Sequence, residues 1–588
     1  MNIDIIGGGE IGGKSKGFFK AKDILCSDEF KKKYPNEAGL LRYPASFCIG
    51  TGVYKNFIER NKFNKLLESQ KASVEDYSYE KFKKRLMQGT FSREFVDEIT
   101  VLLARLPYPL AVRSSSVLED RPGTSFAGKY DTVFVSNRGE IDDRLAQVLT
   151  AIKEVYASTY NPSAVEYRLK HHLVVKEEEM AILLQEAVGR EFDGYFFPLM
   201  AGVGFSKNDY CWSKEIVKEE GLVRLVFGLG TRAVGRGYAR LFSPKKPLIR
   251  PEGNSVREIN KFSQATMDAL NLEFNEIHSF HFSKVVRNGI DCYPRSERLF
   301  SLLDGAHLYN PVTNMWQEDH KPILTFDPVL MKSWCGLHLP TVIDIVFKVL
   351  EEKFGYPVDI EFAIRVDDDK NEAHFYLLQA RPLSQREILA PKPIPPNILQ
   401  DDKLFTAEKS VPTGMIEKID FIVYVDSFAY DKWPINDRYQ VARIIGRINH
   451  LLEGKRFILM GPGRWGSQKV ELGIPTRYSE ISNCSMLVEI ARSTEDYVPE
   501  VSFGTHFFQD LIEDHIVYMP LYPDEPNVVF NEKFLKANNC FEDLITDKHY
   551  SLYKDLIYVV DIPKVTNGHY ARAILNGEIE KAVVYLNR

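Results

Sequence analysis

The stretch PVDIEFAIRVDDDKNEAHFYLLQARPL at 357–383 constrains the fold more than any other part of the chain. Its first half alternates polar and apolar residues, which is the period of a strand with one apolar face. A second strand is expected over 374–381. The acidic, turn-rich DDDKNEA between them is centred near Lys370 and predicts an antiparallel hairpin.

This expected hairpin groups polar side chains on one face. A simple antiparallel register places Glu361 opposite Gln379, and it also places Asp359 opposite Arg381. A carboxylate beside an amide oxygen suits Mg²⁺, a hard cation that is commonly shared between protein groups and substrate phosphates. Arg381 would offset charge on a transferring phosphoryl group. Taken alone, the hairpin is equally compatible with a solvated surface ribbon.

A second stretch, AVRSSSVLEDRPGTSFAGKYDTV at 111–133, favours the phosphate-binding interpretation. In this stretch an apolar run is followed by Arg113 and then by three serines, of which Ser114 is the first. A glycine-bearing loop comes next. Arginine offers a forked, charged group to phosphate oxygens, and serine and glycine let backbone N–H groups approach closely. A helix cap and a polar turn would explain the serines but not the whole array. The two stretches together predict one nucleotide and metal site.

The N-terminal MNIDIIGGGEIGGKSKG satisfies two other phosphate-loop patterns. The matching residues are Gly7, Gly9 and Gly12 for G-x-G-x-x-G, and Gly8, Gly13, Lys14 and Ser15 for G-x-x-x-x-G-K-S. The dinucleotide pattern requires an acidic residue at a second strand end, whereas Asp28 and Glu29 lie in a polar segment. A P-loop site would leave Arg113 and the polar residues of 357–383 without a function. All three interpretations place Lys14 against phosphate.

These motifs resemble the nucleotide-binding domain of the phosphoenolpyruvate synthase and pyruvate phosphate dikinase family. The resemblance rests first on AVRSSSVLED…SFAGKYDT and DIEFAI…LLQARPL. Further segments match in order: IGGKSKGF at 11–18, YPASFCIGTGVYKNFI at 43–58, MAILLQEAV at 180–188 and FGLGTRAVGRG at 227–237. The similarity covers about residues 5 to 385. It implies an α+β ATP-grasp fold for this part of the chain, with ATP and Mg²⁺ as its ligands.

The resemblance also implies roles for individual residues. Lys14, Arg113 and Ser114 would bind ATP phosphates, Glu361 and Gln379 would hold Mg²⁺, and Arg113 and Arg381 would assist transfer. MAILLQEAV is similar to the hinge strand that contacts adenine and ribose, which makes Gln185, Glu186 and Val188 further candidates. Glu186 stands where the family pattern leads us to expect methionine.

The expected domains are an ATP-grasp region over 1–390, a proline-rich linker over 391–400 and a smaller α/β domain over 401–588. Within the last domain, a strand at 419–426, a helix at 438–454 and a strand beginning at Arg456 are expected in order.

Two glycine-bearing turns of this α/β domain, at 461–467 and 502–510, are expected at strand ends, where α/β sheets bind ligands. Arg464 would grip an anion there, and Trp465 would either stack on a substrate or fill the core. His506 is a candidate general base or phosphate carrier, although a single histidine is more often structural.

The C-terminal region departs from the family pattern, because it contains no segment similar to the phosphohistidine domain. Its roughly 190 residues are too few for that domain together with the barrel that converts pyruvate. We therefore expect a chain that is not a complete phosphoenolpyruvate synthase, with a small molecule or a partner protein as the phosphoryl acceptor.

Composition narrows the remaining classes. A net charge of −6 with dispersed lysine and arginine offers no track for a nucleic-acid backbone, so neither DNA nor RNA is expected as a partner. The seven cysteines form no C-x-x-C pair. No apolar run approaches 18 residues and no leader pattern is present, which predicts no membrane association and a cytoplasmic location.

The leading hypothesis is an ATP-dependent phosphotransferase, either a kinase or a dikinase. A regulatory module that senses ATP without turnover and an ATP-grasp carboxylate ligase are the alternatives, since both would use the same nucleotide site.

Overall fold

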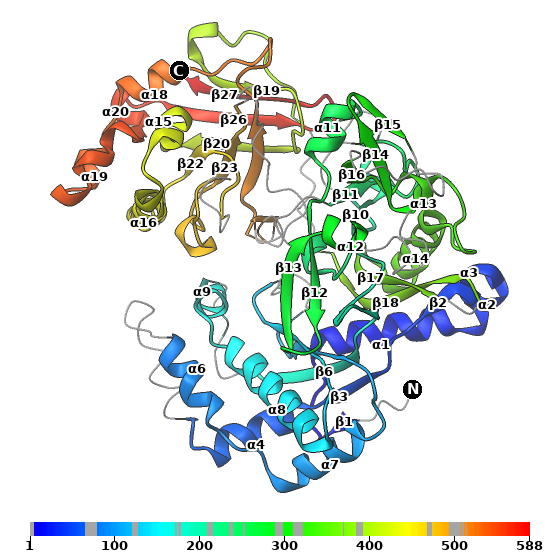
Figure 1. Ribbon diagram of the computed structural model, residues 1–588. Coiled ribbons are helices and arrows are strands. Elements are labelled where there is room, and N and C mark those ends of the chain that lie inside the picture. Colours follow the sequence, from blue (N-terminus) through cyan, green and yellow to red (C-terminus); the bar gives the residue numbers. More distant parts are fainter. Residues whose placement is uncertain are drawn as a thin grey trace. The chain divides into compact units, whose positions relative to one another are not determined.

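The computed structural model separates the chain into two compact units, and each is described by itself (Figure 1). Unit 1 comprises 1–208 and 219–383, and unit 2 comprises 209–218 and 384–588. The structure describes residues 5–64, 79–119, 128–170, 173, 178–208, 216–234, 239–250, 253–287, 298–309, 321–367, 370–383, 392–466, 473–492, 507, 511–512 and 514–588.

The first sheet of unit 1 carries the N-terminal strand and the serine-rich stretch. Its strand order is β1 (Ile5–Ile6), β3 (Ser46–Ile49), β6 (Met180–Glu186), β4 (Leu110–Ser116) and β5 (Thr132–Val135). Only β1 and β3 pair in parallel in the described part, and the other neighbours are antiparallel. This pattern supports neither the dinucleotide fold nor the P-loop fold, because both are built on a parallel sheet.

Helices cover both faces of this sheet. Alternate residues of its strands point in opposite directions, and both faces carry apolar side chains that must be buried. One face packs its apolar side chains, such as Val112 and Ile182, against helices whose buried residues complete a shared core. These helices are α4 (Thr51–Arg60), α6 (Tyr79–Met87), α7 (Arg93–Leu103) and α8 (Ile141–Ser158). The opposite face receives α1 (Gly12–Cys26), whose Phe18 and Phe19 pack on Leu183.

The second sheet of unit 1 contains the hairpin predicted at 357–383. Its strand order is β11 (Arg240–Phe242), β10 (Leu222–Val226), β9 (Met200–Phe205), β17 (Val358–Asp367), β18 (Glu372–Pro382) and β2 (Leu41–Arg42). The helix predicted before the hairpin is α14 (Leu339–Phe354), and Gly355 ends it with φ +83°. Its apolar face packs into the same core as Ile360 and Phe362 of β17.

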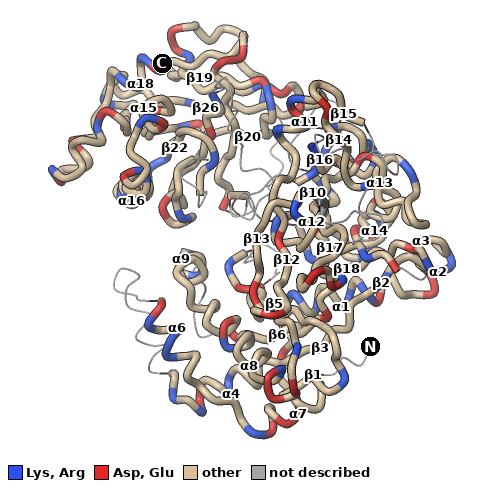
Figure 2. Tube along the Cα trace, in the orientation of Figure 1, with Lys and Arg blue, Asp and Glu red and all other residues tan. Residues whose placement is uncertain are grey.

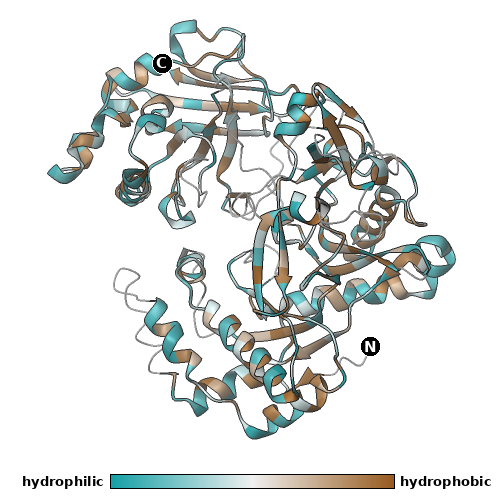
Figure 3. Ribbon diagram, in the orientation of Figure 1, coloured by the Kyte–Doolittle hydropathy of each residue, from teal (hydrophilic) through white to brown (hydrophobic). Residues whose placement is uncertain are grey.

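Smaller sheets and short helices complete unit 1. One of these sheets has the strand order β13 (Glu276–His281), β12 (Thr266–Asn271), β8 (Tyr195–Phe197), β7 (Arg190–Phe192). The other has the strand order β15 (His307–Tyr309), β14 (Phe300–Asp304), β16 (Lys321–Leu324). The short helices are α2 (Asp28–Lys33), α3 (Pro35–Leu40), α9 (Pro162–Lys170), α10 (Thr231–Val234), α11 (Val256–Lys261), α12 (Ser283–Arg287) and α13 (Asp327–Met331). In Figure 3 the strands are largely hydrophobic, whereas the outer helices carry hydrophilic stripes.

Helix α1 contacts both β4 and β18, and glycines permit this close approach. A Cβ on Gly12, which has φ +73°, would lie 1.7 Å from the Ser115 carbonyl oxygen. A Cβ on Gly17 would lie 2.2 Å from the Ala380 carbonyl oxygen. Gly12 and Gly17 therefore permit the packing of one helix against two sheets.

Gly17→Ala is expected to destabilise unit 1, because the new methyl group would push α1 away from β18. Overpacking against backbone costs roughly 1–3 kcal/mol, more than the gain of about 1 kcal/mol in helix propensity. Gly39→Ala is the matched control, since Gly39 is also helical and a Cβ there meets nothing within 4 Å. Thermal unfolding should show a lower Tm for Gly17→Ala and an unchanged or higher Tm for Gly39→Ala. Equal Tm values for both variants would contradict this packing argument.

Unit 2 contains the strand, helix and strand expected after the linker, as β21 (Phe421–Val425), α16 (Ile435–Leu451) and β22 (Phe457–Pro462). Their sheet has the order β24 (Val517–Leu521), β23 (Met486–Ile490), β22, β21, β25 (Ile557–Asp561), in which β24 to β21 are parallel and β25 is antiparallel. The apolar stripe of α16 is buried, apart from Leu451, which is half exposed.

An antiparallel sheet packs on the opposite face of this parallel sheet and forms a second core with it, with the order β19 (Lys403–Ala407), β27 (Lys581–Asn587), β26 (Tyr570–Asn576), β20 (Gly414–Ile419). The other helices are α15 (Ser427–Lys432), α18 (Glu532–Ala537), α19 (Phe541–Leu544) and α20 (Ile562–Val565). Residues 392–399 form neither helix nor strand, whereas 384–391 lie outside the described residues. The domain boundary at 390 therefore stays a prediction.

Candidate functional site

The hairpin β17–β18 has the predicted register at its polar positions. Glu361 pairs with Gln379, and Asp359 pairs with Arg381. Nearer the turn the register shifts by one, because a β-bulge follows Glu361 and leaves Leu378 without a cross-strand partner. The Leu378 carbonyl instead accepts a hydrogen bond from Arg113 Nη1 at 3.3 Å. The bulge thus turns a backbone acceptor toward the first sheet.

The polar face of this hairpin is not solvated. Asp359, Gln379 and Arg381 are each less than 7% exposed. Burial of charged and amide groups is costly unless they are paired. Their burial therefore excludes the interpretation of a solvated surface ribbon.

Lys14 lies in the first turn of α1 and reaches the serine-rich strand β4. Its Nζ donates to Ser114 Oγ at 3.1 Å and lies 2.9 Å from Glu119 Oε1. The turn itself is held by Ser115, whose Oγ accepts from the Ser15 N–H and donates to the Ile11 carbonyl. The pair between Lys14 and Glu119 is almost completely buried. Sequence and fold together therefore place a lysine ammonium at the end of β4.

Arg113 joins the two sheets of unit 1. From β4, its Nη2 donates to Gln379 Oε1 at 2.8 Å and forms a close ion pair with Glu361 Oε2. Its Nη1 donates to Gln185 Oε1 of β6 at 3.1 Å. The predicted phosphate-binding arginine and the predicted metal-binding pair are therefore in direct contact, although 266 residues separate Arg113 from Gln379.

Arg381 forms a separate ion pair within the hairpin. Its Nε and Nη2 donate to Asp359 Oδ2 at 2.9 and 2.7 Å, and both side chains are buried. Arg381 also acts on Glu361 through space, because it is one of the three cations that lower the pKa of that carboxyl group.

The Glu361 carboxyl group is held in its ionised form. Burial raises its pKa, but the positive charges of Arg113, Lys14 and Arg381 outweigh burial and lower the pKa from 4.5 to about 2. All three cations therefore act at one point, which is the electrostatic centre of the candidate site.

The lowered pKa of Glu361 predicts how the free energy of unfolding changes at acidic pH. A carboxyl group with a depressed folded-state pKa stabilises the fold above its unfolded-state pKa, and that contribution is lost as the pH falls toward the folded-state value. Wild type should therefore lose stability relative to Glu361→Gln between pH 4.5 and about 2. Chemical unfolding of both proteins across this range is the measurement. Parallel curves, with a constant difference between the two proteins, would show that the carboxylate does not couple to the cations.

The three candidates from MAILLQEAV lie in different surroundings. Gln185 is buried and bridges the site, since its Oε1 accepts from Arg113 and its Nε2 donates to Ser46 Oγ at 3.1 Å. Glu186 points to the other face of β6, where its Oε2 accepts from the Ala45 N–H. Val188 is buried beyond the strand end. Contact of these residues with adenine or ribose stays a prediction.

Sequence reasoning missed two carboxylates as members of the site. Glu119 accepts from Lys14, Ser114 and the Ser116 N–H, and Asp359 accepts from Arg381. The available signal was general: a buried cation requires a partner, and Glu119 follows the serine run directly. The predicted register had already placed Asp359 opposite Arg381, but the sequence did not specify that Lys14 would pair with Glu119.

Mg²⁺ fits the oxygen atoms that converge here. Glu361 Oε2 and Gln379 Oε1 both contact the same atom, Arg113 Nη2, so the two oxygens face one point. The described residues contain no group of three or more His, Cys, Asp and Glu side chains placed to hold a metal. A pair of oxygen ligands completed by phosphate oxygens and water is nevertheless common for Mg²⁺.

The candidates of unit 2 gain less support. Trp465 is fully buried and packs in the core, which answers the choice left open by the sequence. Arg464 is also buried. His506 lies outside the described residues, so its chemical role stays a prediction.

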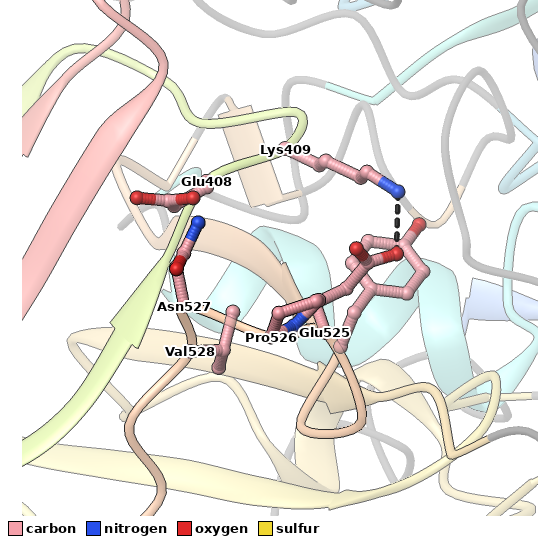
Figure 4. A pocket seen from close by; sticks show the side chains of 7 residues that line it. Glu408, Lys409, Glu525, Pro526, Asn527 and Val528 are labelled. Atoms are coloured by element: carbon pink, nitrogen blue, oxygen red, sulfur yellow. Dashed lines mark hydrogen bonds and ion pairs between the residues drawn. The ribbon is translucent and has the colours of Figure 1, made fainter.

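A small pocket in unit 2 lies between the segments around Glu408 and Glu525 (Figure 4). It encloses about 100 Å³, and Lys409 at its edge is paired with Glu525. A liquid water occupies about 30 Å³, so this volume holds a few waters and not a nucleotide.

Surface charge and hydropathy carry little further information. Figure 2 shows Lys and Arg interspersed with Asp and Glu along the described parts of both units. In those same parts, none of the helices combines the length and the apolar character that crossing a bilayer requires.

Convergent cations beside oxygen ligands are typical of domains that bind nucleotide phosphates through a divalent ion. Comparison with protein families agrees: the family model described as pyruvate phosphate dikinase, AMP/ATP-binding domain, matches residues 9–398. The chain belongs to this family. The resemblance stated from the motifs is thereby confirmed.

Curated relatives match more than half of the chain at low identity. The uncharacterized phosphotransferase YvkC of Bacillus subtilis is 25% identical over 58% of this chain and 31% of its own length. A rifampicin phosphotransferase of Streptomyces sviceus is 23% identical over 58% of this chain and 32% of its own length. A phosphoenolpyruvate synthase of Deinococcus radiodurans is 28% identical over 58% of this chain and 37% of its own length. The matched part thus spans about a third of each relative.

Proposed function

We propose that unit 1 binds ATP with Mg²⁺ in an ATP-grasp arrangement and that the protein transfers a phosphoryl group to an acceptor. The observation that carries this proposal is the contact of Arg113, from the first sheet, with Glu361 and Gln379 of the second. Family membership over residues 9–398 supports AMP or ATP as the ligand. The names of the relatives, phosphotransferases and phosphoenolpyruvate synthases, support the reaction class.

Each side chain has a chemical role in this proposal. Lys14 and Arg113 bind phosphate oxygens through charged hydrogen bonds, and Ser114 orients the Lys14 ammonium. Glu361 and Gln379 hold Mg²⁺, which when bound neutralises charge on the phosphates. Arg381 lies next to this point and offsets the charge that develops during transfer. Because the cluster is buried, these interactions are weakly screened by solvent.

The acceptor does not follow from the relatives, because one is named for rifampicin and another for phosphoenolpyruvate. We propose that unit 2 contributes to acceptor binding, since the carboxyl ends of its parallel strands are where such sheets bind ligands. A partner protein is the other source of an acceptor.

Incubation of the pure protein with ATP and Mg²⁺, followed by separation of nucleotides, tests the proposal. AMP as product indicates a dikinase, and ADP indicates a kinase. Turnover that appears only with an added carboxylate and an amine would instead indicate a ligase. ATP binding without any product, across a panel of phosphoryl acceptors, would indicate a sensor. Glu361→Gln is the control, because intact turnover in that variant would refute the metal assignment.

A further inference from the structure

The cations assigned to the triphosphate are already neutralised within the protein. The described part of the site contains two buried pairs, Lys14 with Glu119 at 2.9 Å and Arg381 with Asp359 at 2.7 Å, and a partly buried pair, Arg113 with Glu361 in close contact. These six charges cancel. These three described pairs therefore offer no net positive charge to an anion that approaches alone, and each of their cations is gained only by breaking an ion pair.

The Arg113–Glu361 pair differs from the other two in one respect. The oxygens of Glu361 and Gln379 that would hold the divalent ion are the same oxygens that contact Arg113 Nη2. Arg113 and a divalent ion therefore compete for them. Breaking this pair for the phosphates alone would leave the Glu361 carboxylate, only about a quarter exposed, without a partner.

We propose that Arg113 and Glu361 form a specificity pair that makes the protein select the metal-bound nucleotide over free ATP. This inference rests on the proposed function, because it assumes that ATP binds at this cluster. Arg113 would turn from Glu361 to the phosphate oxygens only with the metal-bound nucleotide, because Glu361 and Gln379 would then hold the metal ion. Both charges then keep a partner throughout the exchange.

Calorimetric titration with a nonhydrolysable ATP analogue tests the wild type first. Affinity in excess Mg²⁺ should exceed affinity in EDTA by at least roughly tenfold, because the free anion must open the pair. Equal affinities in the two conditions would overturn the specificity pair and leave the proposed function standing. No binding in either condition would instead refute the proposed function.

Glu361→Gln separates the specificity pair from simple metal ligation. If Glu361 only holds metal, the variant loses affinity in Mg²⁺ and keeps the wild-type affinity in EDTA. The specificity pair instead predicts a gain of affinity in EDTA. Because the substitution releases Arg113, affinity for the free analogue should rise by roughly tenfold. An unchanged or weaker affinity in EDTA would contradict the proposal.

A double-mutant cycle shows whether that gain acts through Arg113. In the Arg113→Gln background, adding Glu361→Gln should no longer raise affinity in EDTA, because no guanidinium remains to be released. A gain that persists would mean that the carboxylate merely repels the anion. Glu29→Gln is the matched charge control, since Glu29 pairs with Lys353 on the exposed surface and the substitution removes the same charge. It should leave both affinities unchanged.

Discussion

Lys14→Met is expected to weaken binding of the ATP analogue in Mg²⁺ by roughly 10- to 100-fold, since a hydrogen bond to a charged group contributes about 1.5–3 kcal/mol. Lys14 is the residue on which all sequence interpretations agreed, and the structure gives it a partner on β4 and a buried position. The variant should also be less stable by roughly 3 kcal/mol, because Glu119 remains buried without its cation.

The second effect supplies the control for the first. Lys14→Met combined with Glu119→Gln removes both charges of the pair, so the unfolding free energy should recover while binding stays weak. Calorimetry and chemical unfolding on the two variants measure these quantities separately. If binding recovers together with stability, Lys14 supports the fold only and does not contact the nucleotide.

Arg381→Met is expected to slow phosphoryl transfer by roughly 10²–10³-fold with little change in affinity for the ATP analogue. A group that stabilises charge developing in the transition state affects the rate more than ground-state binding. The rate of AMP or ADP formation by wild type is the reference. A parallel loss of rate and affinity would place Arg381 among the ground-state binding residues instead.

The partner of Arg381 must be removed in a second variant. Asp359 is 2% exposed, and Arg381→Met alone leaves its carboxylate buried and unpaired. Adding Asp359→Asn should restore stability without restoring the rate. Restoration of the rate by this second substitution would show that Arg381 is needed only to neutralise Asp359.

The sequence predicted the hairpin register because alternation and the turn centre together allow few alternatives. It did not predict the bulge at Leu378, since the run YLLQ contains no residue that marks an extra position. The same limit applies to Gln185. Its position in MAILLQEAV was recognised, but its contact with Arg113 depends on strand order in the folded sheet.

The carboxylate partners show a second limit. Cations and anions are visible in a sequence, whereas their pairing depends on which strands and helices become neighbours. Lys14 meets Glu119 because α1 packs across β4, and Gly12 permits that contact. Gly12 also fits the G-x-G-x-x-G pattern, and the pattern alone does not distinguish close packing from phosphate binding.

A crystal structure with a nonhydrolysable ATP analogue and Mn²⁺ tests the central claim most directly. We expect phosphate oxygens within hydrogen-bond distance of Lys14 Nζ and the Arg113 guanidinium, and an anomalous Mn²⁺ peak bound by Glu361 and Gln379. A nucleotide bound elsewhere, with the Lys14–Glu119 and Arg113–Glu361 pairs intact, would contradict it.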